Sequence, residues 1–516
     1  MSDTTVRDAV FRLLRETGMT TIFGNPGSTE LPMFRGFPDD FRYVLSLQES
    51  VALAMADGFA QATRRAALVN LHSAVGVGHA AGSLFTAFRN RTPLVIVAGQ
   101  QARSILRYRP FLYAEQAAEF PKPYVKYSFE PERAEDIPAA IAEGWQIAMT
   151  PPTGPAFISV PVDDWDRPAT LVEVPVPGSL PAPDLTDVAA ALAAASSPAL
   201  VVGAQVSRDG AWDAVVALAE RQHASVWIAP MAAREAFPED HPLFAGFLTA
   251  GREPIVAALA GHDLILVLGA PVFTYHVEGF GPHIPEGATL FQITDDPALA
   301  QAAAAGTPII GNVREAVAAL LETPAPERAL PKPLIRPPVP APEPLTDTYM
   351  LSRLAALRSP DSIIVEEAPS SRGPMHDRPP ILGPDTFHTC ASGGLGHGLP
   401  AAIGVALARP GERVIALLGD GSAMYAIQGL WTAAQLGLPV SFIIVNNGRY
   451  EALVGFGRRF GMNELVGTEL PGIDFVGLAK AQGIRGERVD SADKLDDALI
   501  RSLASEEPSL VEVVVA

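Results

Sequence analysis

The segment Arg413–Tyr450, RVIALLGDGSAMYAIQGLWTAAQLGLPVSFIIVNNGRY, decides the fold. An apolar run ends in Gly-Asp-Gly-Ser, the helical stretch 427–437 follows, and a second apolar run ends in Asn-Asn-Gly. Continuous apolar strands joined by a helix are typical of a parallel sheet that is covered on both faces. We therefore expect strands within 413–421 and 440–448, with their polar ends at one edge of the sheet.

The same alternation runs through all 516 residues. Two Pro-rich stretches, 169–183 and 323–344, are expected to be linkers, because proline removes a backbone donor and favours extended chain. They separate blocks 1–168, 184–322 and 345–516. Each block has four apolar runs that predict buried strands, at 20–24, 66–72, 93–99, 156–162, 198–204, 224–230, 263–270, 289–295, 362–367, 413–421, 440–448 and 509–516. The fold class is α/β, with three doubly wound parallel-sheet domains and helices such as 51–64 between the strands.

Polar residues follow both strands of the opening segment. Asp420 supplies a carboxylate and Asn447 an amide oxygen, and oxygen ligands are those that Mg²⁺ or Ca²⁺ prefers. Gly421 and Ser422 open a helix, whose N-terminal N–H groups favour an anion. Asp-Gly and Asn-Gly are also ordinary turn dipeptides. Their joint position after two neighbouring strands favours a cradle for a diphosphate and its metal ion.

This pattern resembles the thiamine-diphosphate (ThDP) binding motif, Gly-Asp-Gly followed further along the chain by Asn-Asn. The resemblance implies that ThDP is the cofactor, and that Asp420, Asn447 and the backbone carbonyl of Arg449 bind Mg²⁺ (or Ca²⁺). It also implies that Glu49, in SLQESVALAMADGFAQATRR (46–65), lies against the aminopyrimidine of ThDP and activates the cofactor. The alternative for Glu49 is a carboxylate favoured only by the dipole at a helix N-terminus.

Further motifs resemble the 2-keto acid decarboxylases of this family, and benzoylformate decarboxylases in particular. FGNPGS (23–28), NLHS (70–73), AGQQ (98–101) and SVPVDDW (159–165) carry the resemblance. It implies that Ser28 and His72 lie near the substrate, and that His276, at the end of GAPVFTYH (269–276), transfers protons. The alternatives are a plain turn for Asn-Pro-Gly-Ser, a core histidine for His72 and a surface-loop histidine for His276.

The resemblance also implies cofactor and substrate contacts in the third block. In SGGLG (392–396) the glycines let the backbone approach the pyrimidine, and Leu395 props ThDP into a bent shape. Pro369 replaces one hydroxyl residue that touches the diphosphate in the family, and Ser370 keeps the other. The expected cofactor-binding residues are Asn25, Ser370, Gly393, Leu395, Gly421, Ser422 and Tyr450. The expected substrate pocket contains Leu112, Thr389, Ala452 and Phe456, and Thr389 aligns with a phenylalanine, so the pocket should be wider.

Composition limits the partners. The formal net charge of −19 disfavours nucleic acid and anionic lipid, and no apolar run is long enough to span a bilayer. The N-terminus lacks the apolar stretch of a signal peptide, and the single Cys390 fits a reducing compartment, so we expect a cytoplasmic location. The family places ThDP between two chains, which implies a homo-oligomer, a dimer at minimum and a tetramer by resemblance.

We predict a carboxy-lyase that uses ThDP to convert a 2-keto acid, aromatic like benzoylformate, to an aldehyde and CO₂ without oxidation. A carboligase side activity would follow from the same chemistry. One alternative is a carboligase or lyase of the acetolactate-synthase or benzaldehyde-lyase kind, acting on other 2-keto acids or on 2-hydroxy ketones. Both histidines and the lack of an FAD-binding motif count against it. Another alternative is a non-catalytic binding subunit, which the presence of Glu49, Asp420 and Asn447 disfavours.

Overall fold

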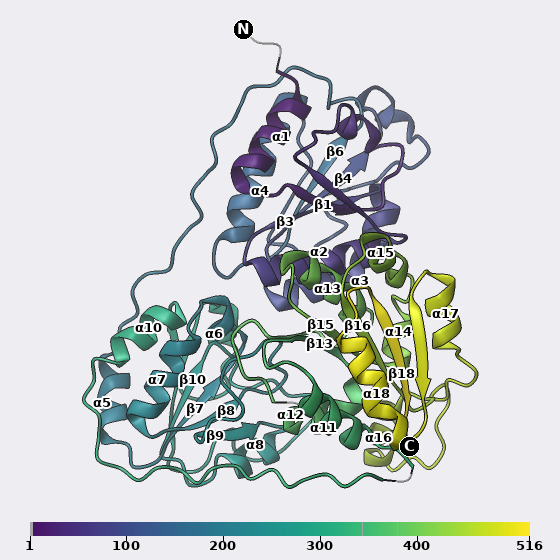
Figure 1. The fold of residues 1–516 in the computed structure, drawn as a ribbon. Coiled ribbons are helices and arrows are strands. Elements are labelled where there is room, and N and C mark those ends of the chain that lie inside the picture. The colour runs from purple at the N-terminus through teal and green to yellow at the C-terminus, as the bar shows by residue number, and fades with distance from the viewer. Residues whose placement is uncertain (1–3, 343, 379) are drawn as a thin grey trace.

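Three parallel sheets organise the computed structural model, which describes residues 4–342, 344–378 and 380–516 (Figure 1). The strand orders are β2-β1-β3-β4-β6-β5 in the N-terminal domain, β12-β11-β10-β7-β8-β9 in the central domain and β14-β13-β15-β16-β18-β17 in the C-terminal domain. Every pair of neighbouring strands is parallel. The predicted α/β class with three doubly wound domains is confirmed.

Each domain alternates strands with covering helices. The N-terminal domain contains α1 (Val6–Thr17), β1 (Thr21–Gly24), η1 (Leu31–Phe34), β2 (Arg42–Leu45), α2 (Glu49–Thr63), β3 (Ala67–Leu71), α3 (Ser73–Asn90), β4 (Leu94–Gln100), η2 (Arg103–Tyr108), β5 (Tyr127–Phe129), η3 (Ala134–Asp136), α4 (Ile137–Met149) and β6 (Ala156–Pro161). The central domain contains α5 (Thr186–Ala194), β7 (Pro198–Val202), α6 (Ala204–Arg208), α7 (Trp212–Gln222), β8 (Ser225–Ile228), β9 (Phe244–Phe247), α8 (Arg252–Ala258), β10 (Leu264–Leu268), β11 (Thr289–Thr294), α9 (Pro297–Gln301), β12 (Thr307–Ile310) and α10 (Val313–Leu320).

The C-terminal domain follows the same plan. It contains α11 (Asp347–Leu357), β13 (Ile363–Glu367), η4 (Pro369–Ser371), α12 (Arg372–Asp377), β14 (Phe387–Thr389), α13 (Gly398–Ala408), β15 (Val414–Gly419), α14 (Asp420–Met424), α15 (Gly429–Leu436), β16 (Val440–Asn446), α16 (Glu451–Arg459), α17 (Phe475–Ala481), β17 (Arg485–Val489), α18 (Ala492–Leu503) and β18 (Ser509–Val514). Its central strands are almost entirely buried, as continuous Val/Ile/Leu runs require.

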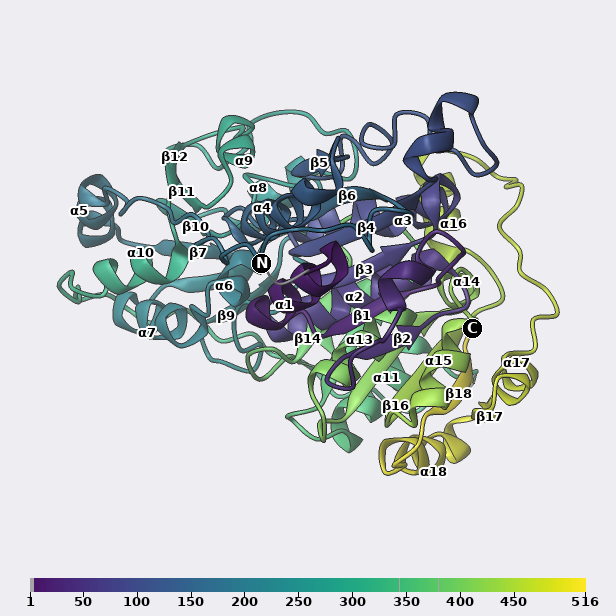
Figure 2. The ribbon, with the colours of Figure 1, turned by 90° about the horizontal axis from the view of Figure 1, so that it is seen from above.

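Helices α2 and α13 join the first and third domains of the chain, and they lie side by side in both views (Figure 1 and Figure 2). Their backbones approach so closely that only glycine fits. A Cβ on Gly58 would lie 2.2 Å from the carbonyl oxygen of Ala401, and a Cβ on Gly404 would lie 1.9 Å from that of Met55. Next to this contact, buried Asp57 pairs with His397 at 2.8 Å. The two domains therefore share one continuous core.

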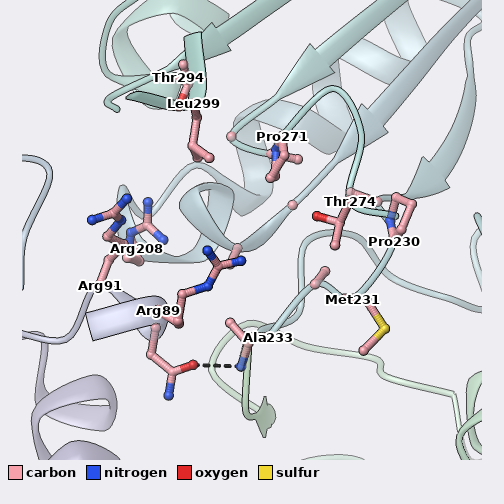
Figure 3. Close-up of a pocket in the computed structure, with 18 residues that line it drawn as sticks. Arg89, Arg91, Arg208, Pro230, Met231, Ala233, Pro271, Thr274, Thr294 and Leu299 are labelled. Atoms are coloured by element: carbon pink, nitrogen blue, oxygen red, sulfur yellow. Dashed lines mark hydrogen bonds between the residues drawn. The ribbon is translucent and has the colours of Figure 1, made fainter. Parts of the chain in front are cut away.

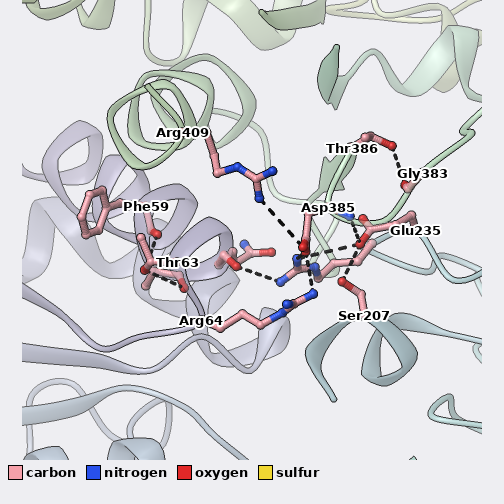
Figure 4. A network of polar contacts seen from close by, with 12 residues as sticks. Phe59, Thr63, Arg64, Ser207, Glu235, Gly383, Asp385, Thr386 and Arg409 are labelled. Atoms are coloured by element: carbon pink, nitrogen blue, oxygen red, sulfur yellow. Dashed lines mark hydrogen bonds and ion pairs between the residues drawn. The ribbon is translucent and has the colours of Figure 1, made fainter. Parts of the chain in front are cut away.

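A buried polar junction ties all three domains together (Figure 4). Arg234 of the central domain is 3% exposed and donates to Asp385 of the C-terminal domain at 3.0 Å and to the Gln61 carbonyl of α2 at 3.1 Å. Arg64, just after α2, reaches the same Asp385 carboxylate at 2.8 Å. The Glu235 carboxylate accepts the Asp385 N–H at 2.9 Å. These contacts fix the relative positions of the sheets, and hence of the polar residues at their edges.

None of the helices in the part of the chain that the structure describes combines the length and the hydropathy that crossing a membrane needs.

Candidate active site

The residues of the predicted cradle lie where β15 and β16 end. These strands pair in register, with Gly419 opposite Val445, so their carboxyl ends meet. Asp420 is 4% exposed, and its carboxylate accepts the N–H groups of Gly421 at 2.7 Å and Gly448 at 2.8 Å. Burial raises the pKa of Asp420, while these N–H donors oppose the rise. The backbone thus holds one carboxylate at the start of α14, where a cation would favour its ionised form.

The residues around Asp420 fit a metal-bound diphosphate. The Asn447 side-chain oxygen accepts the Arg449 N–H at 3.1 Å, so its other lone pair remains available. The Arg449 carbonyl accepts the Glu451 N–H at 3.1 Å and likewise retains a lone pair. A Cβ on Gly421 would lie 2.2 Å from the ring of Tyr450, so only glycine fits there. Among the described residues no three His, Cys, Asp or Glu side chains cluster as a metal site would require, so a cation here would also need amide and carbonyl oxygens.

A second loop is fastened beside the cradle by Glu367, at the end of β13. Its carboxylate accepts N–H groups at the start of α13, from Gly396 at 2.7 Å and from His397 at 2.7 Å. Burial raises the pKa of Glu367 to about 7. The loop carries the predicted Gly393, whose φ of +70° is left-handed, and Leu395. Ser370 is exposed on η4, which contacts both β15 and α16.

Glu49 is the first residue of α2 and is 9% exposed. The Gln48 side chain caps the helix by accepting the Ser50 N–H at 2.7 Å. The Glu49 carboxylate lies 3.0 Å from Nδ1 of His79, which projects from α3. A Cβ on Gly76 would be 3.2 Å from Oε1 of Glu49, so the small residue leaves room for the carboxylate.

His72 is held by a buried glutamate that the sequence did not predict. The Glu30 side chain is 2% exposed, and its Oε2 accepts from Nδ1 of His72 at 2.8 Å and from the Gly27 N–H at 2.9 Å. Thr29 donates to the other carboxylate oxygen at 2.5 Å. Because Nδ1–H faces the carboxylate, Nε2 is the ring nitrogen of His72 left for a further hydrogen bond. Ser28 is exposed in the same loop after β1, beside the partly exposed Asn25.

The predicted pocket residues lie at two places, one beside His72 and the other around Phe456. Leu112, at φ +66°, accepts the hydroxyl of Ser73 through its carbonyl at 2.8 Å, which places it next to His72. On the other side the ring of His276 in the central domain packs edge-on against Phe456, with centroids 4.8 Å apart. Ala452 lies one helical turn before Phe456 on α16. Thr389 is 2% exposed, and polar neighbours described below hold it in the C-terminal domain.

The predicted site residues fall into two groups within one chain. Asn25, Ser28, Glu49, His72 and Leu112 lie at the edge of the N-terminal sheet, and the other predicted residues belong to the cradle side. Among the residues that the structure describes, no hydrogen bond or ion pair joins the two groups. A cleft between the N-terminal and central domains, lined by Arg89, Arg91 and Arg208 among others, contains none of the predicted residues (Figure 3).

Comparison with known proteins identifies the family. The N-terminal, central and C-terminal domain models of the thiamine pyrophosphate enzymes match residues 4–119, 185–320 and 374–513. Benzoylformate decarboxylase of Pseudomonas aeruginosa is 42% identical over 99% of this chain and 98% of its own length. The chain belongs to the thiamine pyrophosphate enzyme family.

Solved structures of thiamine pyrophosphate enzymes agree. The 4-hydroxybenzoylformate decarboxylase of Rhodococcus jostii RHA1 superposes with a TM-score of 0.96 at 42% identity, covering 99% of each chain. Benzoylformate decarboxylase of Polynucleobacter necessarius gives 0.95 at 39% identity, covering 99% of this chain and 98% of its own. The predictions of ThDP as cofactor and of a ThDP-dependent carboxy-lyase acting on 2-keto acids are confirmed.

Three polar residues at this site of the thiamine pyrophosphate enzyme escaped sequence reasoning. They are Glu30 beside His72, His79 beside Glu49, and Arg372 beside Thr389. Glu30 lies two residues after Ser28, within reach of the motif already noted, but nothing in the sequence shows that it is buried. His79 and Arg372 gain their partners only through tertiary packing.

Proposed function

We propose that this enzyme decarboxylates an aromatic 2-keto acid such as benzoylformate, giving the aldehyde and CO₂. The contact between His276 and Phe456 carries the proposal, because it sets a titratable side chain against an aromatic wall on the helix that follows the metal cradle. An aryl ring gains from such a wall through edge or stacked contacts. The names of the Pseudomonas, Rhodococcus and Polynucleobacter relatives, all arylglyoxylate decarboxylases, point to the same substrate class.

The cofactor would be held by the cradle. Asp420, Asn447 and the Arg449 carbonyl would bind Mg²⁺ (or Ca²⁺), an oxygen set that such cations prefer. Ser422 and Gly421 at the start of α14 would face the diphosphate, with Ser370 and Tyr450 beside them, and Asn25, Gly393 and Leu395 would contact the rest of the cofactor. When bound, ThDP supplies the electron sink that lets the carboxylate leave as CO₂.

The chain's own residues position the substrate and move protons. Glu49, at a buried helix N-terminus, would hold a proton against the pyrimidine nitrogen. His72, oriented by Glu30, would present Nε2 to the substrate, and Ser28 would donate its hydroxyl to the substrate carboxylate. His276 would exchange a proton as the aldehyde leaves. Leu112, Thr389, Ala452 and Phe456 would enclose the aryl group and exclude water.

The active site would be shared between two chains. Among the described residues no hydrogen bond or ion pair joins the Glu49 group to the Asp420 group, which supports this. Large apolar side chains are exposed near both halves, including Val75 and Phe111 in the N-terminal domain and Phe460 and Val466 in the C-terminal domain. Such surfaces are typical of interfaces. A dimer is thus the minimum assembly, a tetramer is proposed from the resemblance, and the cytoplasmic location stays part of the proposal.

Product analysis tests the proposed reaction against the carboligase or lyase alternative. Purified enzyme with ThDP and Mg²⁺ would be incubated separately with benzoylformate, with pyruvate and with benzoin, and the products identified by NMR. The proposal predicts benzaldehyde from benzoylformate as the fastest reaction. Faster formation of acetolactate from pyruvate, or of benzaldehyde from benzoin, would instead support the alternative.

A further inference from the structure

A buried polar cluster stands behind the predicted pocket wall at Thr389. Thr389 pairs with Glu366 across strands β14 and β13, and its hydroxyl donates to the Glu366 carboxylate at 2.8 Å. Nη2 of Arg372 donates to the same carboxylate oxygen at 3.0 Å and to the Thr389 hydroxyl at 3.0 Å. Glu366 is fully buried, and the guanidinium beside it helps to hold the pKa of Glu366 below its usual range although burial opposes this. The cluster is therefore an ionised pair.

Arg372 keeps donors that the described residues do not satisfy. Its Nε is buried and has no hydrogen-bond partner among the described residues. Within the described part of the chain its Nη1 reaches only the sulfur of Met231, at 3.6 Å, and a thioether is a weak acceptor. Buried N–H groups without an acceptor are rare, because no hydrogen bond offsets the free-energy cost of their desolvation. One edge of the guanidinium is thus committed to Glu366 and Thr389, and the other edge lacks an oxygen acceptor.

The position of Arg372 connects these donors with the proposed pocket. It begins α12, two residues after Ser370, and the preceding η4 contacts α16, which carries Ala452 and Phe456. The Arg372 side chain is 17% exposed, so part of it remains accessible.

We propose that Arg372 is a specificity-determining residue that donates a hydrogen bond to a neutral oxygen substituent, hydroxyl or alkoxy, on the aryl ring of the substrate. The inference rests on the proposed function and narrows its substrate class. Glu366 already balances the charge of Arg372, so a second carboxylate on the substrate would bring an unpaired charge into a buried site, which is costly. A neutral acceptor satisfies the free donors without that cost.

Matched substrates test the proposal. Rates would be compared for benzoylformate and its 3- and 4-methyl, hydroxy and methoxy derivatives. A methyl group matches a hydroxyl in size but accepts no hydrogen bond. A methoxy group accepts a hydrogen bond but cannot donate one, so it can bind to Arg372 as a donor but not to Glu366 as an acceptor. At one ring position kcat/KM should be about tenfold to a hundredfold higher for hydroxy and methoxy than for methyl, the range of a hydrogen bond to a charged group.

The variant that tests the donor is Glu366→Gln combined with Arg372→Met, which removes both charges together and leaves no unpaired carboxylate. The preference for oxygen, measured as the ratio of kcat/KM for the methoxy and methyl substrates, should fall to less than about threefold. Arg378→Met, at the other end of α12, is the control and should keep the preference. ThDP affinity, titrated by fluorescence quenching, should be the same in all three proteins.

Four results would overturn the proposal. They are equal rates for methyl and oxygen substituents in the wild type, preference for hydroxy but not methoxy, a preference that survives in the double variant, and a loss of ThDP affinity that assigns Arg372 to the cofactor. Failure to decarboxylate any member of the series, with ThDP bound, would overturn the proposed function itself and this inference with it.

Discussion

Replacing Glu30 by Gln tests whether a buried carboxylate positions His72 for catalysis. The Glu30 side chain is 2% exposed and accepts from Nδ1 of His72 at 2.8 Å. A hydrogen bond to a charged group contributes about 1.5–3 kcal/mol. The amide keeps the shape but removes the charge, and its NH₂ group competes to face the ring. Since about 1.4 kcal/mol is tenfold in rate, kcat/KM for benzoylformate should fall about tenfold to a hundredfold.

The assay would follow benzaldehyde formation through a coupled alcohol dehydrogenase, at saturating ThDP and Mg²⁺. A positioning role predicts that kcat falls more than KM rises, because His72 is proposed to act on protons in the reaction and not only in binding. Glu16→Gln, which breaks an exposed pair with Arg12, is the matched control and should retain wild-type kinetics. An E30Q enzyme that is folded, binds ThDP and keeps the wild-type kcat would refute the reasoning.

Three further predictions follow from the structure. Glu49→Gln and Asp420→Asn should each abolish activity alone. Unfolding and refolding the two variants together should restore about a quarter of wild-type activity, because half of the random dimers are mixed and each mixed dimer has one intact site of two. No recovery of activity would contradict a shared site. Burial raises the pKa of Glu239 in the folded protein to about 8. The contribution of Glu239 to folding stability is therefore complete below the pKa of the unfolded chain, near 4.5, and is lost as the pH rises to about 8. Glu239→Gln should therefore increase the denaturant midpoint relative to wild type at pH 8.5 but not at pH 4.5, and an equal difference at both pH values would show that Glu239 does not titrate this way. Gly404→Ala should lower the free energy of unfolding by about 1–3 kcal/mol or more, measured by thermal unfolding, because the new Cβ meets a facing carbonyl. Gly82→Ala, the control, faces open space in helix α3 and should not destabilise the protein. Equal effects of the two substitutions would mean that the contact between the domains relaxes easily.

The strands that the sequence predicted are the four inner strands of each sheet. Each has a continuous apolar run because it is buried on both faces. The six strands without a prediction, β2, β5, β9, β12, β14 and β17, are all edge strands. Most are half-exposed, as in β17, RGERV, and in β12, TPII, and β14 has only three residues. An edge strand pairs on one side only and is less buried, so fewer of its residues need to be apolar and its sequence shows a weaker hydrophobic pattern.

The position of Asp420 and Asn447 at one edge of the sheet could be predicted because the sequence features that determine it are local. Asp420 and Asn447 directly follow strands that pair, so the sequence pattern and the sheet register specify the same place. Glu30 and Arg372 could not be predicted, because their roles depend on a buried partner far along the chain or on a loop from another domain. The sequence also did not predict that Glu366 and Arg372 bind the Thr389 hydroxyl, because the sequence does not show how either side chain is oriented.

The most direct test of the account measures CO₂ and benzaldehyde from benzoylformate, using apoenzyme, enzyme reconstituted with ThDP and Mg²⁺, and reconstituted Asp420→Asn. The account predicts equal amounts of CO₂ and benzaldehyde from the reconstituted wild type, and neither product at a comparable rate from the apoenzyme or the variant. A wild-type protein that binds ThDP yet releases no CO₂ from benzoylformate, or an Asp420→Asn enzyme that retains full activity, would contradict it.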